Sequence, residues 1–423
     1  MEVIWVFLYR NLKNSRFQTD ISGQPIFRSF IAKNFIVSKI QSPIHTLTGL
    51  RGFAALWVVL LHTCFGASNG YLPGFSEKID WGILRNIIVQ GVYAVDIFFV
   101  LSGYILTHVH RREFEETFTL SNVKSFLLLR LARIYPLHLA IVILLTGAYL
   151  VGMWDHKVIA LKDVVLSVSL TNAWSDPSIN PPAWSVSTEW MAYLAFPIII
   201  PLLVRMRSPL WQFIGILGLS AVYPLCVMGY DWGWDWHWGW VALFRVMNGF
   251  VLGCLLYYFQ ENCPLVKNSS LSSRWCFGFL ILLVFFLVRG APIIFIYPFF
   301  PWVILTLAHA RHGIGKIFSN KVAIVMGTVS FSIYMVHYPV LELFRFGLNE
   351  YYSSLIPGVD QGTLWVHLCF ILFSVIAASC LCYWSIEKRC REYLKPRWGH
   401  PETAQPHFVE HETSGIIPIA RKI

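Results

Sequence analysis

The sequence has few charged residues. Asp, Glu, Lys and Arg make up 13% of its 423 residues, whereas hydrophobic residues make up 56%. Soluble chains carry about 25% charged residues, and the mean hydropathy here is +0.57. A soluble protein of this length has too little interior to hide so much apolar surface. These values exclude an ordinary soluble domain and indicate a membrane protein.

Several other signals are missing. The nine cysteines lack metal-ligand spacing and lie mostly in apolar runs, which predicts packing residues and no disulfide framework. There is no secretory signal peptide, because the basic residues near the start follow the first apolar run instead of preceding it. No dense basic stripe accompanies the net charge of +10. We therefore expect no metal and no nucleic-acid partner, and attribute the positive charge to cytoplasmic loops.

Apolar runs of about 20 residues recur along the chain, which is the length needed to cross a bilayer as a helix. They predict an all-α polytopic membrane helix bundle of about ten transmembrane helices. The pair 275–289 and 291–309 is separated by almost no loop. The expected spans are about 46–67, 86–108, 126–152, 186–204, 209–229, 239–259, 275–289, 291–309, 322–344 and 364–386.

Basic residues are unevenly divided between alternate loops, which predicts the orientation. One set of loops holds most of them, and we assign that side to the cytoplasm together with both termini. We expect residues 1–43 to be a cytoplasmic segment that can lie at the membrane interface, residues 44–391 to be the transmembrane domain and residues 392–423 to be a cytoplasmic tail. The other side holds only Lys78, Arg85, Lys157, Lys162, Arg289 and Arg345.

The first predicted span, LTGLRGFAALWVVLLHT, contains two polar groups able to do chemistry, Arg51 and His62. They are eleven residues apart, which places them within roughly 20° of one helix face and roughly 16 Å apart along the axis. Ionisable groups are costly to insert into a membrane and usually face protein or water for a purpose. The structural alternative is an arginine reaching the membrane edge and a histidine satisfied in the interior.

Four further segments place polar groups in apolar surroundings. Asp96 lies near the middle of the second span, and Arg130-x-x-Arg133 forms a pair one helical turn apart at the start of the third. The remaining groups are Trp184, Ser185 and Glu189 at the start of the fourth span, and Tyr334 and His337 in the ninth. The charged groups and the histidine also have structural explanations. The arginines can be the basic flank of a span on the cytoplasmic side, Asp96 and His337 can form hydrogen bonds between helices, and Glu189 can be a carboxylate that stabilises a helix start.

The predicted depths suggest a division of labour. Arg51, Arg130 and Arg133 fall near the cytoplasmic end, where guanidinium groups match the phosphates of coenzyme A. His62 lies deeper, within reach of a pantetheine arm, and is the expected general base for a substrate hydroxyl. Asp96, with support from Glu189, is expected to orient or charge-stabilise the imidazole. The sequence leaves open whether His62 acts as a base or carries the acyl group itself.

Five segments, in this order, resemble the acyltransferase family 3 membrane proteins: TGLRGFAALWVVLLH with its Arg-x10-His spacing, FFVLSGYIL, RLARIYP, AWSVSTEW and SFSIYMVHYP. The closing YWSIEKRCR also resembles the end of that family's last helix. The resemblance runs from about Ile44 to about Arg391. The residues before Ile44 have no counterpart in the family that we can place.

The resemblance implies an integral membrane O-acyltransferase that moves an acyl group, often acetyl, from cytoplasmic acyl-CoA to a hydroxyl. Arg51 and His62 match the family's essential first-helix residues, and Arg130 and Arg133 its Arg-x-x-Arg pair. Trp184, Ser185, Tyr334 and His337 are expected to bind the acceptor. The SGNH-type domain of some members has no match in this sequence, so we expect any acyl relay either to need a partner or not to occur.

The expected acceptor is a cell-surface glycan or glycolipid such as an exopolysaccharide or O-antigen, and the expected location is a bacterial inner membrane. Glycan-assembly proteins and membrane lipids are the expected partners. Two alternatives remain. One is an O-acyltransferase for a small molecule such as a macrolide. The other is a transporter or flippase in which buried His and Asp residues couple proton movement.

Overall fold

The computed structural model describes residues 43–65, 81–115, 118–153, 159–174, 178–229, 238–355 and 361–398. Contacts divide the chain into Met1–Pro43 and Ile44–Ile423, and the described structure belongs almost wholly to the second unit. The predicted cytoplasmic segment 1–43 lies outside the described residues except for Pro43. The side of the membrane on which the termini lie stays a prediction.

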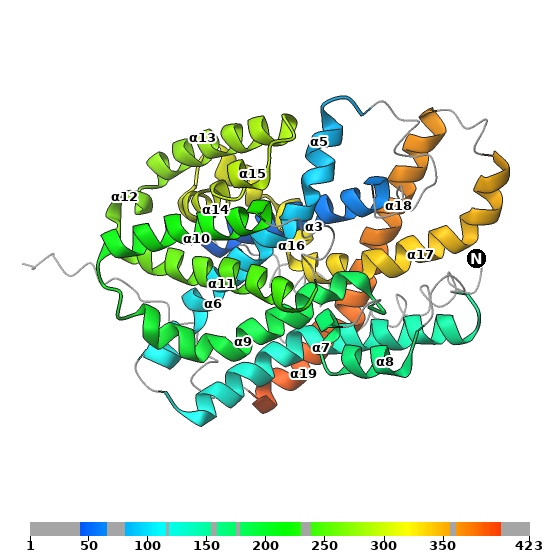
Figure 1. Cartoon of the computed structure of the whole chain (residues 1–423), viewed down its shortest axis with the longest axis horizontal. Helices are drawn as coiled ribbons and strands as arrows, with labels where there is room; N and C mark the ends of the chain where they lie inside the picture. Colours follow the sequence, from blue (N-terminus) through cyan, green and yellow to red (C-terminus); the bar gives the residue numbers. More distant parts are fainter. Residues whose placement is uncertain are drawn as a thin grey trace, which may run out of the picture. The chain divides into compact units, whose positions relative to one another are not determined.

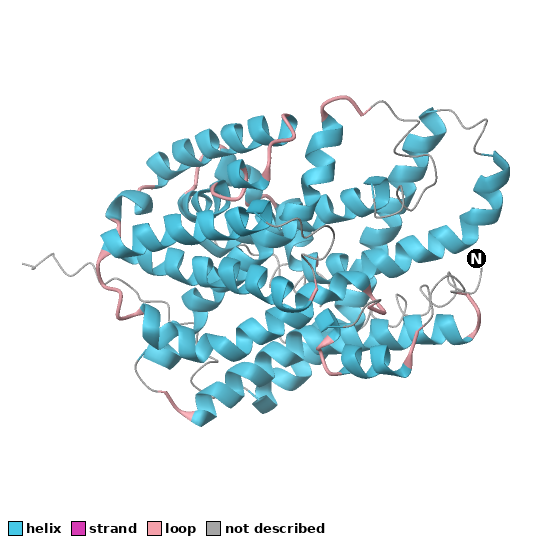
Figure 2. Ribbon diagram, in the orientation of Figure 1, coloured by secondary structure: helices cyan, strands magenta, loops and turns pink. Residues whose placement is uncertain are grey.

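The described residues form helices and connecting loops without a β-strand, which confirms the predicted all-α class (Figure 2). Short 3₁₀ segments occur at Gln90–Tyr93, Asn172–Trp174, Pro181–Ala183 and Ile293–Phe295. The helices are α3 (Pro43–Phe65), α5 (Leu84–Val89), α6 (Ala94–Glu115), α7 (Leu120–Leu150), α8 (Leu161–Val168), α9 (Trp184–Leu203), α10 (Pro209–Gly229), α11 (Gly239–Asn262), α12 (Pro264–Lys267), α13 (Ser269–Val288), α14 (Phe299–His309), α15 (Ile314–Phe318), α16 (Lys321–Thr328), α17 (Ser330–Leu355), α18 (Gln361–Cys382) and α19 (Lys388–Trp398).

All ten predicted spans coincide with helical segments. Eight helical segments among the described residues are long and apolar enough to cross a membrane. A helix satisfies its own backbone hydrogen bonds, which is why apolar runs of this length fold this way in lipid. The chain is therefore a multi-pass membrane protein.

The other two predicted spans differ from single straight helices. The span predicted at 322–344 is a pair, α16 and α17, bent by 65° at Val329. The span predicted at 291–309 is a shorter apolar segment, Ile293–His309. A tight turn precedes it, in which Gly290 has a φ of +63° that glycine adopts without strain.

Polar residues mark where several helices begin. The side chain of Thr119 accepts a hydrogen bond from the backbone N–H of Asn122 at the start of α7. The Asn268 side chain caps α13, and the Asn320 side chain caps α16 in the same way. Such N-caps satisfy donors that have no partner within the helix, and each stabilises its helix by roughly 1 kcal/mol.

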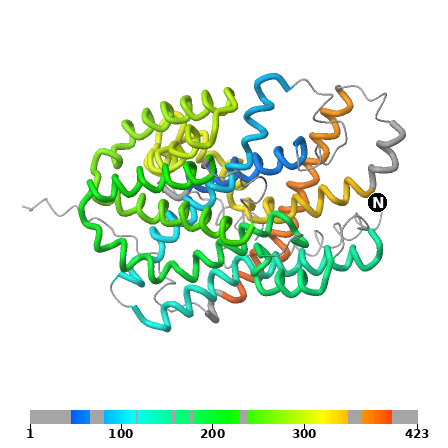
Figure 3. The backbone as a smooth tube through the Cα atoms, in the orientation of Figure 1, coloured from blue at the N-terminus to red at the C-terminus, as the bar shows by residue number. Residues whose placement is uncertain are grey.

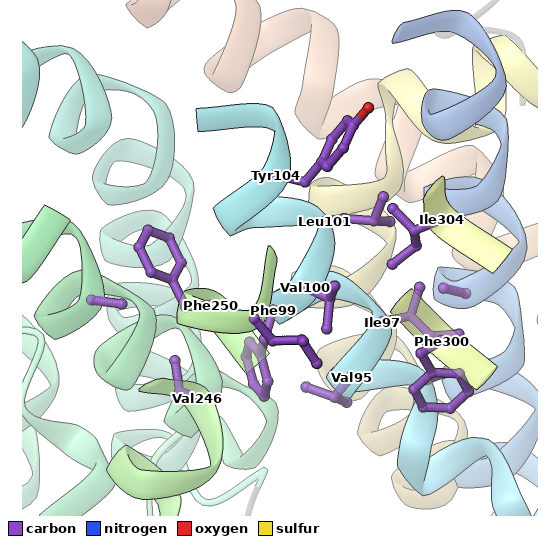
Figure 4. Packing of buried hydrophobic residues seen from close by; sticks show 14 of the residues in the cluster. Val95, Ile97, Phe99, Val100, Leu101, Tyr104, Val246, Phe250, Phe300 and Ile304 are labelled. Carbon is purple, nitrogen blue, oxygen red and sulfur yellow. The ribbon is translucent and has the colours of Figure 1, made fainter. Parts of the chain in front are cut away.

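Helices α6 and α11 form the centre of the larger hydrophobic cluster and lie side by side (Figure 1). Glycines allow this approach, because a Cβ at Gly103 would overlap the carbonyl oxygen of Phe250 and one at Gly253 would overlap that of Val100. Figure 4 shows buried residues of α6 between those of α11 and α14. They are Val95, Ile97, Phe99, Val100 and Leu101 of α6, Val246 and Phe250 of α11, and Phe300 and Ile304 of α14.

A second hydrophobic cluster joins α3 to α17 and α18. Its core residues include Val59 of α3, Ile333 of α17 and Leu368 of α18. The chain then passes through a π-helical turn, Tyr383–Glu387, into α19, which packs against α7 (Figure 3). The first residues of the predicted cytoplasmic tail, 392–398, therefore continue a helix that packs on the bundle. Residues 399–423 lie outside the described residues.

Candidate active site

A cavity lies among α3, α6, α7, α9 and α17. It holds about 840 Å³ of empty space when its open mouth is counted. Six of the ten residues singled out from the sequence line it. The charged and hydroxyl-bearing lining residues are Arg51, Ser102, Arg130, Arg133, Ser185, Glu189, Tyr193, Ser330 and Tyr334.

The three predicted arginines meet in this cavity, although Arg51 is on α3 and the other two are on α7. Neither Arg51 nor Arg133 makes a hydrogen bond or ion pair to any described residue, and Arg130 makes one long hydrogen bond. Most of their N–H donors therefore have no partner among the described residues. Three guanidinium groups with uncommitted donors form a binding site suited to a multiply charged anion such as a phosphate ester.

Arg130 is held in place by His110 of α6, a residue that does not line the cavity and that the sequence analysis did not single out. One Arg130 Nη atom donates to Nε2 of His110 over 3.4 Å, and His110 Nδ1 lies 2.9 Å from Oε1 of Glu113. Since His110 accepts from Arg130 at Nε2, its ring proton must be on Nδ1, where it is donated to the carboxylate. His110 is buried, so this Glu113–His110–Arg130 chain fixes the direction of the guanidinium.

Glu189 faces the arginines from α9. One of its oxygens, Oε1, accepts hydrogen bonds from the Ser102 and Tyr193 hydroxyls, each 2.6 Å long. Arg51 and Arg130 both lie within electrostatic range of this carboxylate. Glu189 thus partly neutralises the arginine cluster, and the hydrogen bonds from the two hydroxyls fix the orientation of its carboxylate.

At another part of the cavity wall, Ser185 and Tyr334 form a hydroxyl cluster. The Ser185 hydroxyl lies 2.8 Å from the Tyr334 hydroxyl, which donates to the carbonyl oxygen of Pro182 over 2.8 Å. These contacts join the segment before α9 to α17. The predicted acceptor-binding residues Ser185 and Tyr334 are therefore together, whereas Trp184 is not among the residues that line the cavity.

His62 and His337 lie beside each other, outside the set of lining residues. Their ring centroids are 5.1 Å apart, and the His337 ring is 5.9 Å from that of Tyr334, which does line the cavity. His62 Nδ1 is 2.9 Å from the carbonyl oxygen of Val58. Because a carbonyl can only accept, the proton of a neutral His62 is on Nδ1 and its Nε2 carries the lone pair. This is the tautomer that a general base at Nε2 requires.

Asp96 is engaged elsewhere. Its two oxygens accept hydrogen bonds of 2.7 Å from Nε and Nη2 of Arg245, and both side chains are 1% exposed. The Arg245 guanidinium also lies 5.3 Å from the centre of the Trp184 ring. The structure therefore groups Asp96 with Arg245 and Trp184, and it does not bring the carboxylate into hydrogen-bonding contact with His62. The backbone at Val58 orients the imidazole instead.

Two further buried groups were missed. Arg245 is an ionisable residue within an apolar run, so the rule that found Asp96 applies to it equally. Glu387 is 1% exposed and accepts a 2.8 Å hydrogen bond from Ser332, and it lies within electrostatic range of Arg51. It ends the π-helical turn, a feature often found at functional sites. No sequence signal marks that turn.

The described residues contain no group of three or more His, Cys, Asp and Glu side chains placed to hold a metal ion. What the site offers is anion-binding guanidinium groups, hydroxyls and imidazoles. That combination suits acid–base group transfer from a phosphate-bearing donor.

Comparisons with curated proteins point in the same direction. The peptidoglycan O-acetyltransferase OatA of Listeria monocytogenes is 26% identical over 334 residues, covering 71% of this chain and 50% of the relative. The O-acetyltransferase OatA of Staphylococcus aureus (strain NCTC 8325) is 24% identical over 372 residues, covering 81% of this chain and 57% of the relative. A protein of Staphylococcus aureus (strain COL), named provisionally as an O-acetyltransferase, is 25% identical over 388 residues, covering 85% of this chain and 59% of the relative.

The chain thus spans between 50% and 59% of the length of these relatives. No solved structure matches it. The model of acyltransferase family 3, described as an acyltransferase domain, matches residues 44–384, which is about four-fifths of the sequence. The family expected from the five sequence segments is confirmed, and the chain belongs to acyltransferase family 3.

Proposed function

We propose that this protein is an O-acyltransferase that moves an acetyl group from cytoplasmic acetyl-CoA to a hydroxyl of a cell-envelope glycan, in the cytoplasmic membrane of a bacterium. The observation that carries the proposal is the convergence of Arg51, Arg130 and Arg133 on one cavity with most of their donors uncommitted. Family membership and the glycan named for one relative support the reaction class and the acceptor.

In this proposal the arginines bind the phosphates of coenzyme A. Each guanidinium presents fork-shaped donors that match phosphate oxygens. Arg51 and His62 are eleven residues apart on α3, a rise of roughly 16 Å, which a pantetheine arm spans. Glu189 serves as the counter-charge that keeps the guanidinium groups in the cavity between donor molecules.

His62 acts as the general base. Its Nε2 takes the proton from the acceptor hydroxyl while the oxygen attacks the thioester carbonyl. The carbon–sulfur bond then breaks with its electron pair on sulfur, and His62 returns the proton to the departing thiolate. The products are an O-acetyl ester and free coenzyme A. Ser185 and Tyr334 are assigned to the acceptor hydroxyl, because they bring paired hydroxyls to the same cavity.

Transport is the alternative function that the intramembrane ionisable residues first suggested. The bidentate ion pair between Asp96 and Arg245 argues against a proton-carrying role for Asp96, because the carboxylate is fixed by a partner with which it forms a neutral pair. Thermal stabilisation of the purified full-length protein by coenzyme A separates the two. An acyltransferase is stabilised by the donor, and a transporter of another solute is not.

The test of the reaction compares surface glycans by mass spectrometry from cells with the wild-type gene, with His62→Ala and with no gene. We expect an increment of one acetyl group only with wild type, with equal membrane levels of wild type and variant. His62 supplies general-base catalysis, typically worth about 10²–10⁴ in rate. Normal acetylation in the His62→Ala cells would remove His62 from the mechanism.

A further inference from the structure

The break between α16 and α17 lies at the wall of the cavity. α16 ends at Thr328 and α17 begins at Ser330, and the two helices are bent by 65° around Val329. The hydrogen bonding of α17 starts with the bond from the Ile333 N–H to the Val329 carbonyl oxygen, 2.9 Å long. The N–H groups before Ile333 have no partner within α17, as in the first turn of any helix. Ser330 and Phe331 line the cavity, so this helix end forms part of its wall.

The Ser330 side chain is a second and independent sign of a ligand. It is 0% exposed, and its Oγ makes no hydrogen bond to any described residue, so it does not cap α17. A serine hydroxyl donates one hydrogen bond and accepts up to two, and leaving it buried without a partner costs free energy. Because Ser330 also lines the cavity, a bound ligand is the partner that its hydroxyl lacks.

The other hydroxyls of the cavity wall are bonded within the protein. Those of Ser102 and Tyr193 donate to the Glu189 carboxylate. The hydroxyls of Ser185 and Tyr334 bond to each other and to a backbone carbonyl oxygen. Among the described residues that line the cavity, only the Ser330 hydroxyl is left without a partner.

Ser330 lies between the level of the arginines and that of the imidazoles. A Cβ on Gly52 of α3 would be 2.7 Å from the backbone nitrogen of Gly327. Ten residues later in both segments, the rings of His62 and His337 are 5.1 Å apart, so the two segments run in the same direction. Ser330 precedes His337 by seven residues, a rise of roughly 10 Å, whereas the arginine of α3 precedes its histidine by roughly 16 Å.

The proposed reaction brings a polar chain past this level. A coenzyme A donor with its phosphates at the arginines and its thioester at His62 passes its pantetheine arm along the wall that contains Ser330. The arm carries two amides, and an amide that leaves water without a hydrogen bond weakens binding. Much of the remaining wall offers no such bond, because it is formed by Val95, Phe98, Phe99, Leu101, Ile105, Leu106, Ile134, Val186 and Phe331.

We propose that the N-terminus of α17 is the binding site for the pantetheine arm: the Ser330 hydroxyl and the free N–H groups of the first turn donate to the amide carbonyl farther from the sulfur. This inference rests on the proposed function. About eight bonds separate that carbonyl from the sulfur, which span roughly 10 Å in an extended chain, the same rise that separates Ser330 from His337. The contact sets the depth of the thioester relative to His62.

The experiment uses inside-out membrane vesicles from source cells carrying the full-length protein, and measures the free thiol released from three thioesters. Acetyl-CoA has the phosphates and both amides. S-Acetyl-pantetheine lacks the phosphates, and S-acetyl-N-acetylcysteamine also lacks the amide farther from the sulfur. Vesicles with His62→Ala give the background for each thioester.

Ser330→Ala removes only the hydroxyl. We expect the KM for acetyl-CoA to rise about two- to tenfold, the usual effect of losing one neutral hydrogen bond, with kcat unchanged, because the contact is the same in the ground state and the transition state. The kcat/KM for S-acetyl-pantetheine should fall by the same factor. For S-acetyl-N-acetylcysteamine it should not change, because the carbonyl that Ser330 binds is missing.

Two measurements separate this role from packing. Thr328→Ala is the matched control, since its hydroxyl lies on the other side of the same break, bonds to the Ile324 carbonyl oxygen of its own helix and lines no part of the cavity. Its KM for acetyl-CoA should stay within about twofold of wild type. The purified, donor-free Ser330→Ala protein should have a Tm equal to or above that of wild type, because a buried hydroxyl without a partner has been removed.

The outcomes are distinguishable. If Ser330→Ala leaves the KM for acetyl-CoA unchanged, or impairs all three thioesters equally, the inference is wrong while the proposed function stands. A loss seen with acetyl-CoA alone would place Ser330 at the phosphates and overturn the assignment to the arm. If Ser330→Ala does not accumulate in the membrane, Ser330→Cys, which keeps a weak donor, should show a smaller KM rise with the same dependence on the thioester. If wild-type vesicles release no more thiol than His62→Ala vesicles, the proposed function and the inference fail together.

Discussion

Two groups of arginines within the helix bundle behave in opposite ways. Arg245 is paired with Asp96 through two short hydrogen bonds and is almost wholly enclosed. Arg51 and Arg133 line a cavity and bind no described residue. In both arrangements, removing the charged guanidinium from water costs free energy. In the first, a carboxylate of the same chain offsets that cost, so the arginine contributes to structure. In the second, the charge is left for a ligand, which indicates function.

The largest effect should come from breaking the structural pair. Arg245→Ala leaves Asp96 as an uncompensated buried charge, which typically costs about 3–5 kcal/mol. We expect the variant to lose most of its thermal stability and membrane level. Replacing both partners, as in Asp96→Leu with Arg245→Met, should restore much of the loss, because an apolar pair has no charge to compensate. Thermal unfolding in detergent measures both. A stable Arg245→Ala protein would show that this pair is not structural.

The cavity arginines should give the reverse pattern. Arg133→Ala removes a cation that has no partner in the protein, so stability should change by less than about 1 kcal/mol. Acetyl-CoA binding should weaken by about 10- to 100-fold, corresponding to about 1.5–3 kcal/mol for a hydrogen bond to a charged group. Isothermal titration measures this. Arg111→Ala is the control, since Arg111 pairs with Glu115 and Glu261 outside the cavity. Equal effects in the two variants would count against a donor site.

A smaller effect is expected from the histidine behind Arg130. His110→Phe keeps the aromatic contact with Phe126 but removes the acceptor for the guanidinium. Donor affinity should fall about fivefold, or about 1 kcal/mol, the usual net value of one hydrogen bond. In an Arg130→Ala background the same change should have no further effect, because the two residues act through one contact. Independent, additive losses would show that His110 does not act through Arg130.

The positions of the helices could be predicted from the sequence, because a bilayer requires about 20 apolar residues per span and these runs are plainly visible. The break at Val329 was not predictable from hydropathy, since the apolar pattern of α16 and α17 runs through it. The short segment Ile293–His309 was predicted at nearly the right bounds. Its length was already limited by the turn at Gly290.

The arginine cluster could be predicted because the loop charges orient each predicted span, and that orientation sets how deep each residue of the span lies in the membrane. Arg51, Arg130 and Arg133 all fall near the same end of their helices, and helix ends on one side of a bundle lie close together. Pairing across helices was not predictable in this way. Asp96 and Arg245 are 149 residues apart, and their contact depends on which faces of α6 and α11 meet. The role of His110 was hidden because it lies among charged residues at a helix end, where a positive-inside flank is expected.

The central claim is that donor binding and chemistry belong to different residues, the arginines and His62. The most direct test measures acetyl-CoA affinity and acetyl transfer together, in the same membrane vesicles, for Arg133→Ala and His62→Ala. We predict that His62→Ala binds acetyl-CoA as wild type does but transfers nothing. Arg133→Ala should bind weakly yet transfer at saturating donor. If His62→Ala loses donor affinity to the same extent as Arg133→Ala while retaining transfer at saturation, the assignment of the two roles is contradicted.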